Sequence, residues 1–71
     1  MVAEVFEIVV RGRVPEALAA ELVGFEIRPD AETTVVRGPV ADQAKLLGVL
    51  GLIRGFDAAI VSVTSRGPAV D

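Results

Sequence analysis

The chain has 71 residues, of which 52% are hydrophobic, and its ten acidic and seven basic side chains give a net charge of −3. It contains no His, Cys, Asn, Tyr or Trp. These absences exclude disulfides, argue against a structural zinc site, and remove the usual general base and thiol nucleophile of enzymes. We therefore expect a protein that is not an enzyme and that binds no metal or cofactor.

The charge balance and the hydropathy pattern also limit the partners. Scattered basic residues in an acidic chain do not provide the basic surface that phosphate binding requires, so we expect no nucleic acid partner. The longest apolar run, residues 46–53, is too short to cross a bilayer. Glu4 and Glu7 interrupt the region where a secretory signal would be apolar. With no cysteine either, we expect a cytoplasmic protein without a membrane partner.

The first half of the chain predicts two strands separated by a short helix. β-Branched residues predict a strand over residues 5–11. Pro15 suits the first position of a helix over residues 15–23, and Gly24 suits the position after its end. Apolar and charged side chains then alternate over residues 25–28, which predicts a second strand with one buried face.

The second half repeats the strand–helix–strand pattern. Residues 33–37 predict a third strand, joined to the second by a turn. Asp42 suits the cap of a helix over residues 43–54. Two glycines inside this helix, at positions 48 and 51, predict a close approach of its backbone to the sheet or to the first helix. Residues 60–63 predict the fourth strand.

The element order β-α-β-β-α-β predicts an α+β, ferredoxin-like fold. Right-handed crossovers then give a four-stranded antiparallel sheet in the order 4-1-3-2, with both helices on one face. We expect a single domain over residues 1–65 and a flexible tail over residues 66–71. The expected core consists of apolar residues on the covered side of the sheet and on the helices: Phe6, Ile8, Val10, Leu18, Leu22, Phe25, Ile27, Val36, Leu46, Leu50, Ile53, Val61 and Val63.

A chain this short buries only about 60% of its unfolded surface, so we expect it to self-associate. Strand parity places Val9, Val35 and Ile60 together on the open face of the sheet. An apolar centre with a charged rim is typical of an interface. The predicted interface therefore consists of these three residues with Glu7, Arg11 and Arg37. A homo-oligomer is the expected assembly, and such a module can serve as an accessory or regulatory subunit of a larger protein.

The second helix offers an alternative interface. Leu46, Leu50 and Ile53 share the stripe that is predicted to face the sheet. Val49 and Leu52 fall largely outside this stripe, so they are the residues of the alternative interface.

The topology also resembles that of ACT-like amino-acid-sensing domains. This resemblance implies a small-molecule-sensing function, with a metabolite bound at a subunit interface. The corresponding ligand loop consists of Gly12, Arg13, Pro15 and Glu16. Glu16 departs from the family pattern, because ACT-like domains usually have a glycine after the proline that begins the first helix.

Three segments carry a further resemblance over most of the chain. They are Phe6-Glu7-Ile8 with Arg11-Gly12-Arg13, the turn Gly38-Pro39-Val40-Ala41-Asp42-Gln43-Ala44, and the apolar helix over residues 46–53. The chain is similar in these segments to short uncharacterised ferredoxin-like proteins of high-G+C, actinobacterial-type bacteria. The shared segments are a strand, a turn and a capped helix, so the resemblance implies a fold and brings no catalytic residue.

Overall fold

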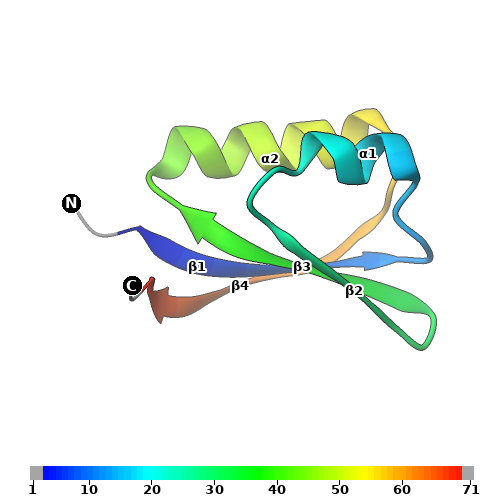
Figure 1. Ribbon diagram of the computed structural model, residues 1–71, viewed down its shortest axis with the longest axis horizontal. Helices are drawn as coiled ribbons and strands as arrows, with labels where there is room; N and C mark the ends of the chain where they lie inside the picture. The colour runs from blue at the N-terminus through cyan, green and yellow to red at the C-terminus, as the bar shows by residue number, and fades with distance from the viewer. Residues whose placement is uncertain (1–2, 70–71) are drawn as a thin grey trace.

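The computed structural model describes residues 3–69 (Figure 1). Its elements are β1 (Glu4–Arg11), α1 (Glu16–Glu21), β2 (Glu26–Asp30), β3 (Thr33–Val40), α2 (Gln43–Gly55) and β4 (Ile60–Pro68). Both helices lie on the same side of a four-stranded antiparallel sheet, as Figure 1 shows. The chain is therefore an α+β protein with one covered and one open sheet face.

The strands lie in the order β2-β3-β1-β4, which is 4-1-3-2 when it is read from the other edge of the sheet. β1 and β3 form the centre, with Ile8 opposite Val36 and Val9 opposite Val35. Residues that lie opposite each other on antiparallel strands point to the same face, and successive residues point to opposite faces. Ile8 and Val36 therefore face the helices, whereas Val9 and Val35 lie on the open face.

The core lies between the sheet and the helices. Its fully buried side chains are Ile8, Val10, Leu18, Val36 and Ile53. All five belong to the predicted core. Leu22 is also buried, and five further predicted core residues are partly buried: Phe6, Phe25, Ile27, Leu46 and Leu50. The prediction is wrong for Val61 and Val63 of β4, which are 50% and 40% exposed.

The alternative interface on α2 is wrong for Val49. Val49 is buried in the core, and Leu52 is partly buried and packs against the core. The apolar stripe of α2 is wider than predicted because α1 packs against one flank of the helix, so α2 is covered by the sheet and by α1 together. Leu50 packs against the core but remains half-buried.

The placement of Ile60 on the open face is also wrong. The register of β1 with β4 shifts between Val9 and Val10, so Val9 lies opposite Ser62 but Val10 lies opposite Ile60. One extra residue in β4 reverses the parity of the strand at this point. Ile60 therefore points to the covered side, where it packs against the core.

The predicted boundary between domain and tail is wrong as well. β4 continues to Pro68, which lies opposite Glu4, and the Ala69 amide donates to the Ala3 carbonyl at 2.7 Å. A second register shift, near Gly67 with its φ of 96°, keeps the strand paired with β1. Only residues 70–71 of the predicted tail lie outside the described residues.

The two glycines inside α2 do not mark a close contact, contrary to the prediction. A Cβ added at Gly48 or Gly51 would meet no other group within 4 Å. Positions 44, 48, 51 and 55 share the outer face of the helix by their spacing, so these small residues lie on the side turned away from the sheet.

Candidate interaction surface on the open sheet face

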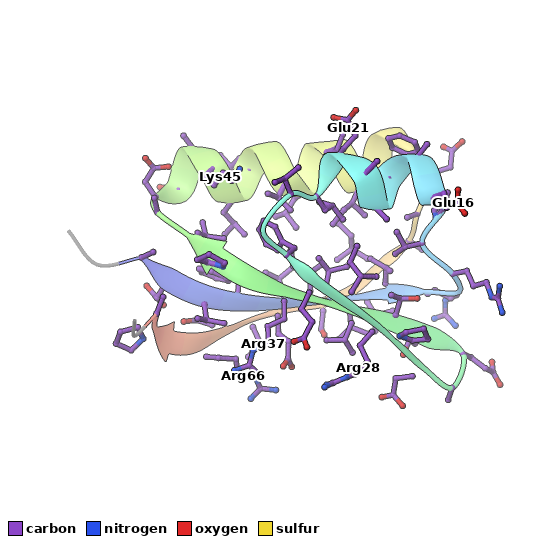
Figure 2. The ribbon with its side chains drawn as sticks, viewed as in Figure 1. Glu16, Glu21, Arg28, Arg37, Lys45 and Arg66 are labelled. Atoms are coloured by element: carbon purple, nitrogen blue, oxygen red, sulfur yellow. The ribbon has the colours of Figure 1, made fainter. Side chains whose placement is uncertain are left out.

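The sheet face without helices, which we call the open face, is built from two central cross-strand rows. From β2 to β4, the first row reads Glu26, Arg37, Glu7 and Thr64, and the second row reads Arg28, Val35, Val9 and Ser62. Figure 2 shows Arg28, Arg37 and Arg66 on the side of the sheet opposite the helices. The face is therefore a charged row beside a row with two central valines.

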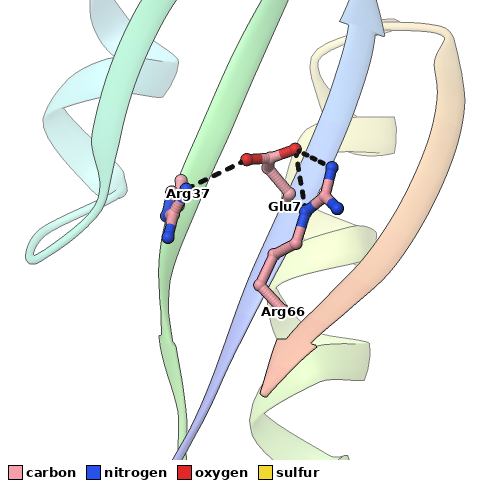
Figure 3. Close-up of polar contacts among 3 residues, drawn as sticks. All are labelled: Glu7, Arg37 and Arg66. Carbon is pink, nitrogen blue, oxygen red and sulfur yellow. Dashed lines mark hydrogen bonds and ion pairs between the residues drawn. The ribbon is translucent and has the colours of Figure 1, made fainter. Parts of the chain in front are cut away.

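Glu7 lies at the centre of the charged row, between two arginines from neighbouring strands (Figure 3). Arg37 Nη1 donates to Glu7 Oε2 at 3.3 Å, and Arg66 Nη2 donates to Glu7 Oε1 at 2.9 Å. Arg66 Nε adds a second contact with the same oxygen at 3.3 Å. The Glu7 side chain is 15% exposed, whereas those of Arg37 and Arg66 are 46% and 51% exposed. Both guanidinium groups therefore keep donors that face solvent.

The arginines also set the titration of Glu7. The hydrogen bond from Arg66 lowers the pKa of Glu7 below its ordinary value of 4.5, against the opposing effect of burial. The positive charges of Arg66, Arg37 and Arg28 lower this pKa further. Glu7 is therefore a carboxylate at neutral pH, held by three cations on the same face.

Basic residues gather on the open face. Of the side chains in residues 3–69, it carries four of the seven basic ones but only three of the nine acidic ones. These are Arg11, Arg28, Arg37 and Arg66, with Glu7, Glu26 and Asp30. An acidic protein thus has one face on which both signs of charge alternate and positive charge is slightly in excess.

Five of the six predicted interface residues lie on the open face. Val9 and Val35 are adjacent at its centre, and Glu7, Arg11 and Arg37 surround them. Val35 is already buried by its neighbours, and Val9 is partly exposed. Whether this set forms an interface stays a prediction.

Arg66 is the residue of this surface that the sequence interpretation missed. It lies in the predicted tail over residues 66–71. The period-two pattern of Ser62, Thr64 and Arg66 on one face of β4 is the signal that could have placed it.

The predicted ligand loop uses its own backbone groups internally. The Gly12 amide donates to the Glu32 carbonyl at 2.7 Å, and the hydroxyl of Thr34, a buried residue, donates to the Gly12 carbonyl at 2.6 Å. Arg13, Pro15 and Glu16 are exposed. These contacts hold the loop against β3 and the β2–β3 turn.

Two shallow cavities lie on the helical side, and neither is lined by the predicted ligand loop. The larger, of about 370 Å³, lies between the start of α2 and the end of the sheet, and the smaller, of about 250 Å³, lies between α1 and α2. Both carboxylates of the larger cavity have partners within the chain. Asp42 accepts from the Lys45 amide at 2.9 Å, and Glu4 accepts from the Ser65 hydroxyl.

Residues 3–69 contain no group of three acidic side chains that could hold a metal ion. Within the same residues, no helix has the length and apolar character needed to span a membrane.

The fold and this surface define a small α+β domain in which one sheet face is covered by helices and the other is open and charged. The family described as a domain of unknown function (DUF8691) matches residues 5–64, so the chain belongs to this family. The match begins inside β1 and ends inside β4, and it covers the remaining elements completely. No curated protein and no solved structure matches the chain significantly.

Proposed function

We propose that this protein is a non-enzymatic, cytoplasmic interaction module that self-associates by packing its open face on that of a second copy. The same module can serve as an accessory or regulatory subunit of a larger protein. We further propose the ferredoxin-like label for its fold, which the β-α-β-β-α-β order and the order of the strands support.

The observation that carries the proposal is the self-complementary order of the two central rows. Two sheets can stack face to face about a two-fold axis that runs along the strands, between β1 and β3. Rotation about this axis places each row of one copy opposite the same row of the other copy, with the order of the strands reversed. The charged row then places Arg37 of each copy opposite Glu7 of the other, and the second row places Val9 opposite Val35.

The other in-plane axis, perpendicular to the strands and through the valine row, fits less well. It would place the charged row of one copy on the row of Asp30, Thr33 and Arg11 in the other. Glu7 would then meet Arg11 favourably and Arg37 would meet Thr33, but Glu26 would meet Asp30 and Arg28 would meet its own copy, which are contacts of like charges. Like charges in contact disfavour an arrangement, so charge complementarity selects the axis along the strands.

Alternating charge also favours a protein over a nucleic acid as the partner of this face. Glu7, Glu26 and Asp30 interleave with the arginines, and a phosphate backbone would meet these carboxylates at close range. The small-molecule-sensing alternative has less support, because the backbone amide and carbonyl of Gly12 are already bonded within the chain.

The test is a charge reversal with rescue by mixing. Glu7→Arg and Arg37→Glu each place like charges across the proposed interface, so each variant should form smaller particles than the wild type in sedimentation velocity. An equimolar mixture should regain the wild-type mass, because every intersubunit contact then joins Arg to Glu. Mixing cannot restore the contact within one chain, so rescue reports on the interface alone.

Three controls complete this test. Circular dichroism checks that both variants fold, and Glu16→Arg on α1 should leave the mass unchanged. Val9→Lys should reduce the mass because it places a charge in the apolar centre, whereas Arg37→Ala should have a weak effect, since an exposed ion pair contributes about 0–1 kcal/mol. A mixture that stays small, or a Val9→Lys variant of wild-type mass, would overturn the open-face assignment.

A further inference from the structure

The two edges of the sheet differ in how they are protected against pairing with another strand. Natural sheets protect their edges with charges, proline and short strands. The β2 edge has all three features, since it is five residues long and contains Arg28, Pro29 and Asp30. The β4 edge is nine residues long, and residues 60–65 contain neither charge nor proline. Bulges also protect edges, but the two register shifts of β4 lie at residues 60–62 and 65–68, so residues 62–65 between them pair regularly with β1.

β4 also has the composition of a strand that pairs. Ile60, Val61, Val63 and Thr64 are β-branched, and such side chains favour the extended conformation. β1 pairs with one side of β4, and within residues 3–69 no strand pairs with its other side. A row of backbone donors and acceptors is therefore available along an uncharged segment.

The helical layer stops short of this edge. Val63 lies opposite Ile8 and points to the same covered side, yet Ile8 is fully buried and Val63 is 40% exposed. On the facing helix, Leu47 is 59% exposed. Its helical position is on the flank of α2 opposite to Val49 and Leu52, which line the groove with α1. An apolar surface that includes Val63 and Leu47 thus remains uncovered between β4 and the free flank of α2.

We propose that the β4 edge pairs antiparallel with the β4 edge of a second copy, about a two-fold axis near Val63. This would join two sheets into one continuous sheet of eight strands and bring both α2 helices to the same side of it. The two Val63 side chains would then meet under the two free flanks of α2. This surface is separate from the open face and does not depend on it.

A second copy fits this edge better than an isolated extended peptide. Pairing about Val63 places no like charges opposite each other, because residues 60–65 are uncharged. A second copy also supplies its own α2, which would cover the apolar surface that includes Val63 and Leu47. A peptide would form hydrogen bonds with the backbone groups of β4 but would leave that apolar surface exposed.

The absence of cysteine from the chain allows a direct test by cross-linking. Residues that lie opposite each other on antiparallel strands have Cβ atoms about 4.5–5.5 Å apart, close to the separation in a disulfide. Val63→Cys should therefore form a covalent dimer within minutes of mild oxidation. Val23→Cys, at an exposed valine distant from β4, is the matched control and should remain monomeric on a denaturing gel.

Charge substitution provides the second measurement. Val63→Lys should reduce the particle mass in sedimentation velocity, and the control Val23→Lys, at a valine that is 82% exposed, should not. If both surfaces operate, Val63→Lys and Glu7→Arg each leave a dimer and the double variant is monomeric. Hydrogen exchange should show protection of the β4 amides that point away from β1 in the wild type, and Val63→Lys should abolish this protection.

The two proposals fail in different ways. If Val63→Cys cross-links no faster than Val23→Cys and Val63→Lys keeps the wild-type mass, the edge-pairing proposal is overturned, whatever happens at Glu7 and Arg37. If Val63→Lys reduces the mass but mixing the charge-reversed variants gives no rescue, the edge-pairing proposal is supported and the open-face proposal is overturned.

Discussion

The ring of Phe25 packs against the backbone of Gly38 in the space where a side chain at position 38 would begin. A Cβ placed there would lie 2.5 Å from Phe25 Cδ2 and 2.8 Å from Cγ. Gly38 lies on the covered side of β3, opposite Phe6, so the missing side chain leaves room for an aromatic ring beneath α1 and α2. This contact, and not a special backbone angle, explains the glycine inside a strand.

Gly38→Ala should therefore destabilise the protein by about 1–3 kcal/mol, which is typical of an overfilled core. Urea denaturation followed by circular dichroism measures the change in the free energy of unfolding. A variant as stable as the wild type would show that the ring moves aside without cost.

Gly51→Ala should have the opposite effect. A Cβ at this position would lie in open space on the outer face of α2. Alanine in a helix interior is favoured over glycine by roughly 0.5–1 kcal/mol, chiefly because glycine loses more backbone entropy on folding. The same denaturation experiment should show a gain of about this size. A loss of stability would indicate that the glycine face of α2 contacts a neighbouring molecule.

Ile53→Ala should be the most damaging truncation on α2. The side chain is fully buried, and removal of a buried Ile costs roughly 2–5 kcal/mol, close to the whole stability of a small domain. Loss of the cooperative thermal transition is the expected result. Lys45→Ala serves as the control, since this residue is exposed on the same helix and its truncation should shift the melting temperature little. Equal effects at both positions would contradict the observed helix orientation.

The stability of the protein should depend on pH through Glu7. The arginines lower its pKa in the folded state below 4.5, so the unfolded chain binds more protons near that pH. The contribution of Glu7 is therefore fully present above about pH 4.5, the unfolded value, and is lost as the pH falls through the lower, folded pKa.

Comparison of the wild type with Glu7→Gln isolates this effect. The difference between their free energies of unfolding should be largest at neutral pH and should shrink as the pH falls below 4.5. Glu21→Gln, on the exposed surface of α1, controls for the loss of one negative charge elsewhere. A Glu7→Gln difference that is constant from neutral to acidic pH would contradict the pairing of Glu7 with the arginines.

The sequence by itself determined the elements, their order and most of the core. Period-two alternation and capping residues are local signals, so they could be recognised at β1, at β2 and at the Asp42 cap of α2, whose carboxylate accepts from the Lys45 amide as predicted. The same alternation placed Glu7, Val9, Val35 and Arg37 on one face, because β1 and β3 pair without a register shift.

Only the tertiary structure decided the residues whose environment depends on a distant segment. The register shift of β4 against β1 near Val9 moves Ile60 to the core, and no local pattern in β4 marks where the extra residue is inserted. Arg66 reaches Glu7 because β4 continues beside β1 beyond residue 65. Val49 is buried because α1 lies beside α2, whereas Val63 is exposed because the helical layer ends before β4. Burial at both positions is set by which element lies next to them, and the apolar character of the residue alone cannot specify that.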